Sequence, residues 1–201
     1  MSKLFFSPDF TQEFSWNGKT LKVGSVTSES RKKISDALNR MSHETIRNRF
    51  MGGKKGFTET ELNHLTILDG FNHYALGVEE ANGDQNGLAV ARVYRSPENP
   101  KVGEVGIILV DDYQKIGLGT FLLKLLMAAA LERGIEELSF SYLPQNTGIV
   151  KLVKRIHPPR MISESADAAK MILDLKDILF ADLKAELQQV LPEIGNFHLK
   201  I

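Results

Sequence analysis

The residues best suited to chemistry lie in the segment 104–120, where a run of apolar residues leads into a glycine-rich turn. Gln114, Gly117 and Gly119 are spaced as Gln-x-x-Gly-x-Gly, and an apolar stretch of helical length follows to about Arg133. The first N–H groups of a helix have no partner inside it, and the helix dipole favours negative charge at that end. Glycine admits positive φ angles and has no Cβ, so the backbone can approach a ligand closely. The pattern therefore predicts a site that binds the phosphates of a cofactor.

Two common phosphate-binding motifs do not fit this turn. No Gly-Lys-Ser/Thr closes it, as in a P-loop, and it lacks the Gly-x-Gly-x-x-Gly spacing of dinucleotide-binding folds. The strand, the turn and the helix, with the Val-Asp-Asp-Tyr-Gln lead-in, resemble motif A of the GNAT superfamily of acyl-CoA N-acyltransferases. That resemblance implies a mixed α/β fold, with a central, mostly antiparallel sheet flanked by helices. It also implies acetyl-CoA or coenzyme A as the co-substrate, and we expect no metal.

The resemblance further implies which residues contact coenzyme A. In the family the fourth and fifth strands splay apart to admit pantetheine, the turn offers N–H groups to the pyrophosphate, and an asparagine holds the pantetheine or adenosine side. The corresponding positions in this sequence are Ile107, Ile108, Leu109, Gln114, Lys115, Ile116, Gly117, Leu118, Gly119, Thr120 and Asn146. Two structural alternatives stay open, because 107–109 also suits a core strand and Asn146 also suits a helix N-cap.

Acyl transfer to an amine requires the uncharged amine, which for lysine lies about 4.6 kcal/mol uphill at pH 7. A general base adds roughly 10²–10⁴-fold to the rate, and positioning of the two reactants adds more. Glu104, at the start of the strand, is our candidate base, and it matches a position where protein-lysine acetyltransferases of the family carry a glutamate. The alternative is a solvated carboxylate at a strand end.

Other candidate groups carry less chemistry. We expect Asp111 and Asp112 to serve the turn and the start of a helix, because no histidine or third carboxylate lies at metal-ligand spacing. Family members often place a tyrosine seven residues beyond the asparagine, but here that position is Val153, which leaves the general acid to Tyr142 or to water. The five histidines form no catalytic or metal-binding pattern.

The remaining periodicity predicts the order strand, helices, three strands, helix, strand, helix and two strands. Expected strands cover 21–26, 71–80, 87–94, 104–110, 137–142, 160–163 and 170–175, and expected helices cover 30–40, 42–50, 58–67, 117–133, 146–155 and 175–190. A turn at Asn82-Gly83-Asp84 joins two strands, Ser42 caps one helix, and Thr58 with Glu61 forms a capping box on the next. Gly134 ends the long helix.

We expect a single compact domain with two appended segments. Residues 1–18 form an N-terminal extension packed on the domain, residues 19–175 form the GNAT domain, and residues 176–201 form a C-terminal helix and tail. The 25 basic and 25 acidic residues balance, so we expect no nucleic-acid partner. The N-terminus lacks a signal-peptide core, and the most apolar run is too short to span a bilayer. We therefore expect a cytoplasmic protein without a membrane partner, either monomeric or homodimeric.

Two further segments narrow the resemblance. Residues 38–50 contain Ser-x-Glu-x-x-Arg-x-Arg-Phe, and His73-x-Ala-Leu follows, as in the N-terminal half of bacterial GNAT protein-lysine acetyltransferases. This implies direct attack of an amine on bound acetyl-CoA, with a protein lysine as the favoured acceptor. One alternative is a small-molecule amine, which an acidic pocket near Glu104 favours over an open, shallow groove. The other is a non-catalytic acyl-CoA-binding sensor or interaction domain, which a Glu104 turned away from the cofactor favours.

Overall fold

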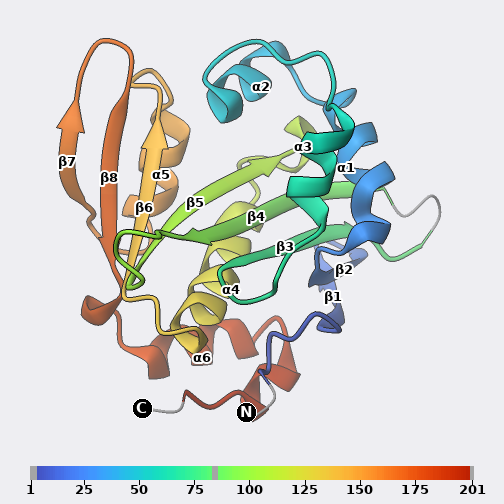
Figure 1. Ribbon diagram of the computed structural model, residues 1–201. Coiled ribbons are helices and arrows are strands. Elements are labelled where there is room, and N and C mark those ends of the chain that lie inside the picture. The colour runs from blue at the N-terminus through green and yellow to red at the C-terminus, as the bar shows by residue number, and fades with distance from the viewer. Residues whose placement is uncertain (1–3, 83–85, 200–201) are drawn as a thin grey trace.

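The computed structural model describes residues 4–82 and 86–199, which fold around an 8-stranded sheet with the strand order β1-β2-β3-β4-β5-β6-β8-β7 (Figure 1). The strands are β1 (Thr11–Trp16), β2 (Lys19–Ser25), β3 (His73–Glu80), β4 (Gly87–Arg95), β5 (Val102–Leu109), β6 (Glu137–Tyr142), β7 (Arg160–Glu164) and β8 (Ala169–Asp174). The helices are α1 (Arg31–Leu38), α2 (His43–Phe50), α3 (Glu59–Thr66), α4 (Leu118–Glu132), α5 (Thr147–Lys154) and α6 (Phe180–Gln188). All neighbouring strands pair antiparallel except β5 and β6, which pair parallel. The predicted mixed fold with a mostly antiparallel sheet is confirmed.

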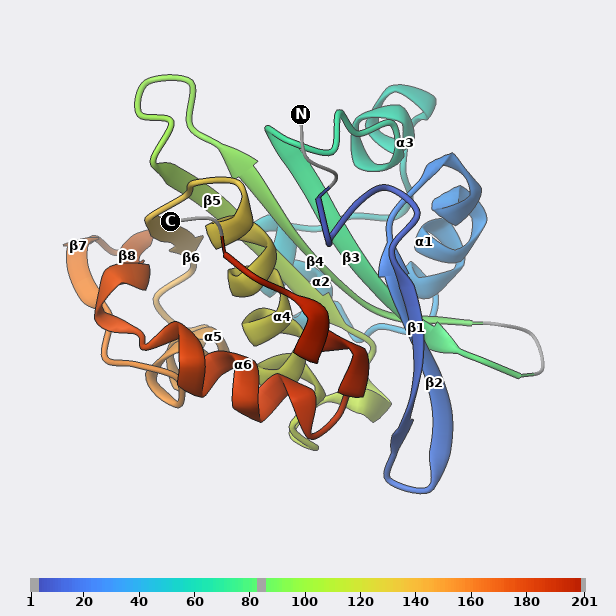
Figure 2. The ribbon, with the colours of Figure 1, turned by 90° about the horizontal axis from the view of Figure 1, so that it is seen from below.

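Helices lie on both faces of the sheet. Helices α1, α2 and α3 cover one face, and α4 and α6 cover the other (Figures 1 and 2). Helix α4 is the centre of the core, because most of its residues are fully buried against the sheet and against α6. Its one charge before the last turn, Lys124, forms an ion pair with Glu186 of α6. Within the described residues, no helix is both long and apolar enough to cross a bilayer.

The helix caps predicted from the sequence are present. The Ser42 hydroxyl accepts a hydrogen bond from the backbone N–H of Thr45, and Thr58 and Glu61 cap each other at the start of α3. Gly134 follows α4 with φ of +74°. The predicted turn at 82–84 falls largely on residues outside the described part of the chain.

Residues 11–16 form strand β1, which the sequence analysis does not predict. Burial alternates along this edge strand, with Gln12, Phe14 and Trp16 on the inner face, but the polar Gln12 interrupts the apolar pattern in the sequence. The strand pairs with β2 through a two-residue turn, Asn17-Gly18, in which both residues have positive φ. Both φ values are what a two-residue β-hairpin turn requires.

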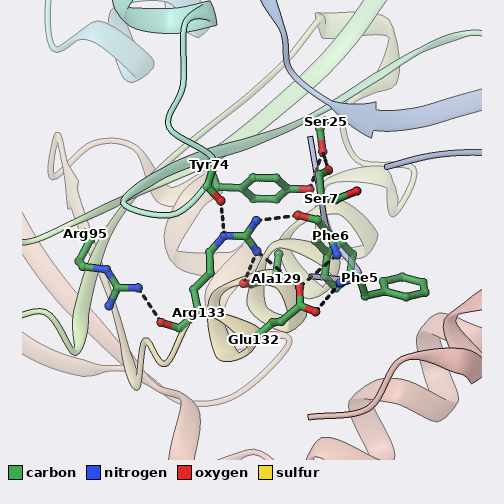
Figure 3. Close-up of polar contacts among 10 residues, drawn as sticks. Phe5, Phe6, Ser7, Ser25, Tyr74, Arg95, Ala129, Glu132 and Arg133 are labelled. Atoms are coloured by element: carbon green, nitrogen blue, oxygen red, sulfur yellow. Dashed lines mark hydrogen bonds and ion pairs between the residues drawn. The ribbon is translucent and has the colours of Figure 1, made fainter. Parts of the chain in front are cut away.

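The segment before β1 is fixed to the core by the charged end of α4 (Figure 3). The Arg133 guanidinium donates hydrogen bonds to the backbone carbonyls of Phe6, Gly70 and Ala129 at 2.6, 2.9 and 2.8 Å. Its central carbon also lies 3.8 Å from the centroid of the Tyr74 ring. The neighbouring Glu132 carboxylate accepts from the backbone N–H groups of Phe5 and Phe6. One pair of side chains thus joins three distant parts of the sequence.

The C-terminal helix is shorter than predicted. The expected helix over 175–190 begins instead as a single 3-10 turn at Leu175–Asp177, and α6 starts only at Phe180. The Asp174 carboxylate accepts a hydrogen bond from the backbone N–H of Lys176, and this local turn competes with helix formation. The predicted apolar positions Leu183 and Leu187 are buried, and α6 packs on α4.

Candidate active site

Strands β5 and β6 splay apart. Their parallel pairing covers only three residue pairs, Val102 with Glu137, Gly103 with Leu138 and Glu104 with Ser139. Beyond Glu104, β5 runs on to Leu109 without β6 beside it. A cleft of about 520 Å³ opens there, bordered by the ends of both strands and by the starts of α4 and α5. The sheet therefore has a V-shaped gap next to the glycine-rich turn, as the resemblance implies.

Nine of the eleven predicted cofactor residues line this cleft. They are Ile107, Ile108, Leu109, Gln114, Lys115, Gly117, Gly119, Thr120 and Asn146. The side chains of the other two lie elsewhere, since Ile116 is 38% exposed at the surface and Leu118 is fully buried in the core. Leu118 can therefore contact a cofactor only through its backbone.

The turn presents a row of free backbone donors. No backbone N–H from 115 to 120 donates a hydrogen bond to any described residue, whereas the next one, of Phe121, bonds the carbonyl of Gly117 at 3.1 Å. Lys115 and Gly117 have φ angles of +61° and +90°. Such a run of N–H groups at a helix N-terminus suits a pyrophosphate, which accepts several hydrogen bonds and carries negative charge. The residues present fit a phosphate-bearing cofactor.

Helix α2 holds the turn in place. The Gln114 side-chain amide donates to the Thr45 hydroxyl at 2.9 Å and to the Leu109 carbonyl at 3.1 Å. The Asp111 carboxylate accepts from the backbone N–H and the hydroxyl of Ser42, both at 2.7 Å. Asp111 therefore serves the start of a helix, as predicted, but the helix is α2 rather than α4.

Replacing Asp111 by alanine should lower the free energy of unfolding at neutral pH by about 1–2 kcal/mol, as for other lost N-terminal caps. Burial raises the pKa of Asp111, but hydrogen bonds from Ser42 and Thr45 outweigh it, so its pKa lies below the ordinary value. The stabilisation is thus complete above the unfolded pKa of about 3.9 and is lost as the pH falls through the folded value. Denaturant unfolding at pH 7 and pH 3 checks this, and a difference between wild type and variant that stays constant contradicts it.

Three cations around the cleft were not predicted from the sequence. Lys151 and Arg155 of the α5 region and Arg49 of α2 line it together with Lys115, against the acidic Glu44 and Asp111. The i, i+4 spacing of Lys151 and Arg155 was visible in the sequence. Their position beside the glycine-rich turn was not, because only the tertiary fold brings α5 to the cleft. The excess of positive charge favours a polyanionic ligand.

Comparison with known proteins agrees with this geometry. Residues 43–157 match the family model described as "Acetyltransferase (GNAT) family". This chain belongs to that family. The resemblance stated from the motif is therefore confirmed.

Individual relatives of this GNAT chain show how far the likeness extends. It is 31% identical over 116 residues to "Acetyltransferase Pat" of Mycolicibacterium smegmatis, a match that spans 57% of this chain and 34% of that protein. The GNAT domain of S. lividans PAT superposes with a TM-score of 0.73 at 19% identity, covering 82% of this chain and 97% of that domain. The yncA protein of Salmonella typhimurium, solved with its cofactor acetyl-CoA, superposes with a TM-score of 0.61 at 15% identity, covering 77% and 94%.

The phenol nearest the GNAT cofactor region is Tyr142. Of the four tyrosines in the sequence, all within the described part, it alone lines the cleft, whereas Val153 is buried in the core. Burial raises the pKa of Tyr142, and the charge of Glu164 adds to this. The phenol therefore stays protonated at neutral pH and can donate a proton.

The Asn146 side chain accepts a hydrogen bond from the backbone N–H of Ile149 at 3.3 Å, so it caps α5 at the rim of the cleft.

We expect Tyr142→Phe to lower kcat by about tenfold, within the range for general acid–base catalysis, with little change in coenzyme A affinity. Steady-state rates of thiol release, with calorimetry of coenzyme A, measure the two quantities. An unchanged kcat assigns the proton donor to water instead.

Glu104 lies at the vertex of the V in this GNAT fold. It is the last residue of β5 that pairs with β6, and its side chain is exposed. Since side chains alternate along a strand, it shares a sheet face with Gly106 and Ile108, both on the wall of the cleft. Its neighbour across the sheet is Tyr94, which is 45% exposed. The carboxylate is therefore open to solvent beside the cleft.

Proposed function

We propose that this GNAT protein transfers an acetyl group from acetyl-CoA to the side-chain amine of a lysine in another protein. The observation that carries the proposal is the position of Glu104, which is exposed at the vertex where β5 and β6 separate. The surface next to it is accessible, because Tyr94, its cross-strand neighbour, is nearly half exposed. The edge strand β7, which lies beyond β6 and β8, is exposed at every residue. A lysine on a folded partner could reach this face.

In this proposal each group has a separate task. The free N–H groups of 115–120 and the cations Lys151 and Arg155 hold the phosphates, and the backbone of 107–109 positions the thioester. Glu104 accepts the proton that makes the lysine amine nucleophilic, and Tyr142 returns a proton to the leaving sulfur. Acetyl-CoA supplies the activated acyl group, which passes directly to nitrogen as the C–S bond breaks.

A small polyamine is a poorer candidate for the acceptor. The pocket next to the cleft has four cationic and three acidic lining residues, and one of the acids, Glu79, is ion-paired with Lys22 and Lys33. Arg49 and Arg92 form no ion pair with a described residue, so the pocket is not the acidic one that a polycationic acceptor requires. Like charges repel an ammonium group in this position.

The direct test is thiol release from acetyl-CoA with lysine-containing proteins and with small amines as acceptors, together with calorimetry of acetyl-CoA and coenzyme A. We expect micromolar binding of both coenzyme forms and turnover with protein lysine. No heat with either coenzyme contradicts the cofactor assignment. Binding without turnover of any amine favours a non-catalytic acyl-CoA sensor, and turnover of small amines alone contradicts the protein substrate.

A further inference from the structure

A second cavity adjoins the cleft on the face of the sheet that carries α1, α2 and α3. Its volume is about 270 Å³. Much of its wall is apolar, with Leu38, Phe50 and Phe57 among the lining residues. Three residues, Arg49, Gly106 and Ile108, border both the cavity and the cleft. The cavity therefore begins at the part of β5 where the resemblance places the acyl group.

A buried arginine projects into this cavity. Arg92 of β4 pairs across the sheet with Gly106 and is only 9% exposed. Its guanidinium donates to the Leu65 carbonyl at 3.3 and 3.4 Å and contacts the His73 Nε2 at 3.2 Å. Burial, and then the charge of Arg49, lowers the pKa of Arg92 to about 9, so it remains cationic at pH 7. No carboxylate in the described chain lies within ion-pair distance of it.

A second guanidinium lies beside it without a hydrogen-bond or ion-pair partner among the described residues. Arg49 of α2 makes no side-chain hydrogen bond or ion pair with a described residue, and its guanidinium lies 5.4 Å from the centroid of the Phe50 ring. A Cβ added to Gly106 would overlap the Arg49 guanidinium. The absence of a Cβ at Gly106 thus leaves the space over β5 that the Arg49 side chain occupies. The opposing charge that acts on Arg49 is that of Glu104.

Two adjacent cations without a carboxylate are costly in a folded protein. Desolvation of each charge costs several kcal/mol, which an ion pair or a hydrogen-bonded anion can offset. The planar guanidinium binds a carboxylate through two parallel hydrogen bonds, and such charge-assisted bonds are among the strongest in proteins. An apolar pocket with two convergent cations at its mouth suits a short carbon chain that ends in a carboxylate.

We propose that Arg49 and Arg92 bind a carboxylate carried by one of the two reactants. The inference rests on the proposed acyl transfer and specifies its substrates. The carboxylate is either the far end of a dicarboxylic acyl group on coenzyme A or an acidic group beside the lysine of the acceptor. In either case the lysine nitrogen forms the new C–N bond, the thioester C–S bond breaks, and the thiolate of coenzyme A takes up the proton.

The first arm of the test compares succinyl-CoA with butyryl-CoA, which carry four-carbon acyl groups that differ in the terminal carboxylate. Calorimetry should show succinyl-CoA binding at least tenfold more tightly to the wild type, with this preference lost in Arg92→Met and in Arg49→Met. Arg47→Met is the matched control, because Arg47 lies on the same helix but is exposed. It should keep the wild-type preference.

The second arm uses acetyl-CoA with lysine peptides that carry either glutamate or glutamine beside the lysine. If the carboxylate belongs to the acceptor, kcat/KM is at least tenfold higher for the glutamate peptide, and only the Arg92→Met and Arg49→Met variants lose the difference. Arg49→Met also keeps or raises the melting temperature without ligand, because its guanidinium makes no hydrogen bond or ion pair with a described residue.

Binding of free coenzyme A separates this inference from the proposed function. Equal coenzyme A affinity in the wild type, Arg92→Met and Arg47→Met shows an intact cofactor cleft. If neither arm then shows a carboxylate preference, the inference alone is overturned. A melting temperature lowered by Arg49→Met, without any change in preference, assigns the arginine a structural role and also overturns it. No heat with coenzyme A contradicts the proposed function and this inference together.

Discussion

Glu104→Gln should lower kcat by at least tenfold at neutral pH and leave the affinity for coenzyme A nearly unchanged. Glutamine keeps the size of the side chain but cannot accept the proton of an ammonium group. A general base contributes roughly 10²–10⁴-fold, which sets the scale of the loss. Since Glu104 is exposed at the vertex and is not part of the core, the variant should fold normally.

Thiol-release kinetics between pH 6 and pH 9, with calorimetry of coenzyme A, measure this effect. The deficit should shrink as the pH approaches the lysine pKa of about 10.4, because the acceptor amine then needs less help to lose its proton. Glu98→Gln is a suitable control, since this carboxylate lies in the exposed loop before β5. A Glu104 variant as active as the wild type removes this residue from the mechanism.

Arg133→Met should lower the free energy of unfolding by about 3 kcal/mol, because breaking a buried charge network is strongly destabilising. The side chain is 3% exposed, and its loss leaves the carbonyls of Phe6 and Gly70 without their donor. The variant also loses the cation–π contact with Tyr74. For a chain of this size, the melting temperature should fall by about 6–12 °C.

Denaturant unfolding followed by circular dichroism measures the free energy of unfolding, and Arg47→Met again supplies the exposed arginine for comparison. The segment before β1 should also become accessible to proteases in the Arg133 variant, because the guanidinium binds the carbonyl of Phe6 directly. A loss below about 1 kcal/mol would show that the network contributes little to stability.

The sequence predicted the parts of the fold that depend on neighbouring residues. The caps at Ser42 and Thr58 and the turn around Gly117 each combine residues a few positions apart, and each appears in the structure. The Asn17-Gly18 hairpin had an equally local signal, since Asn-Gly is the commonest sequence for such a turn. It was missed because polar Gln12 occupies an inner position of the first strand and interrupts the apolar pattern.

Features that depend on distant residues were not predictable from a single sequence. Asp111 binds the start of α2 across 69 positions, and Arg49 of the same helix lies over Gly106 of β5. The residue types give no sign of either contact, because their side chains could equally face solvent. The assignment of α2 and its cations to the wall of the cleft therefore required the fold.

The short pairing between β5 and β6 has a mechanical consequence. Three residue pairs join the two halves of the sheet, so strand pairing alone holds them together only weakly. Helix α4 packs against β3, β4 and β5 and also contacts α5, which follows β6. It therefore acts as the rigid spacer that sets the width of the gap. Substitutions at buried positions of α4 should therefore change the affinity for a ligand in the cleft, even where the substituted residue does not contact the ligand.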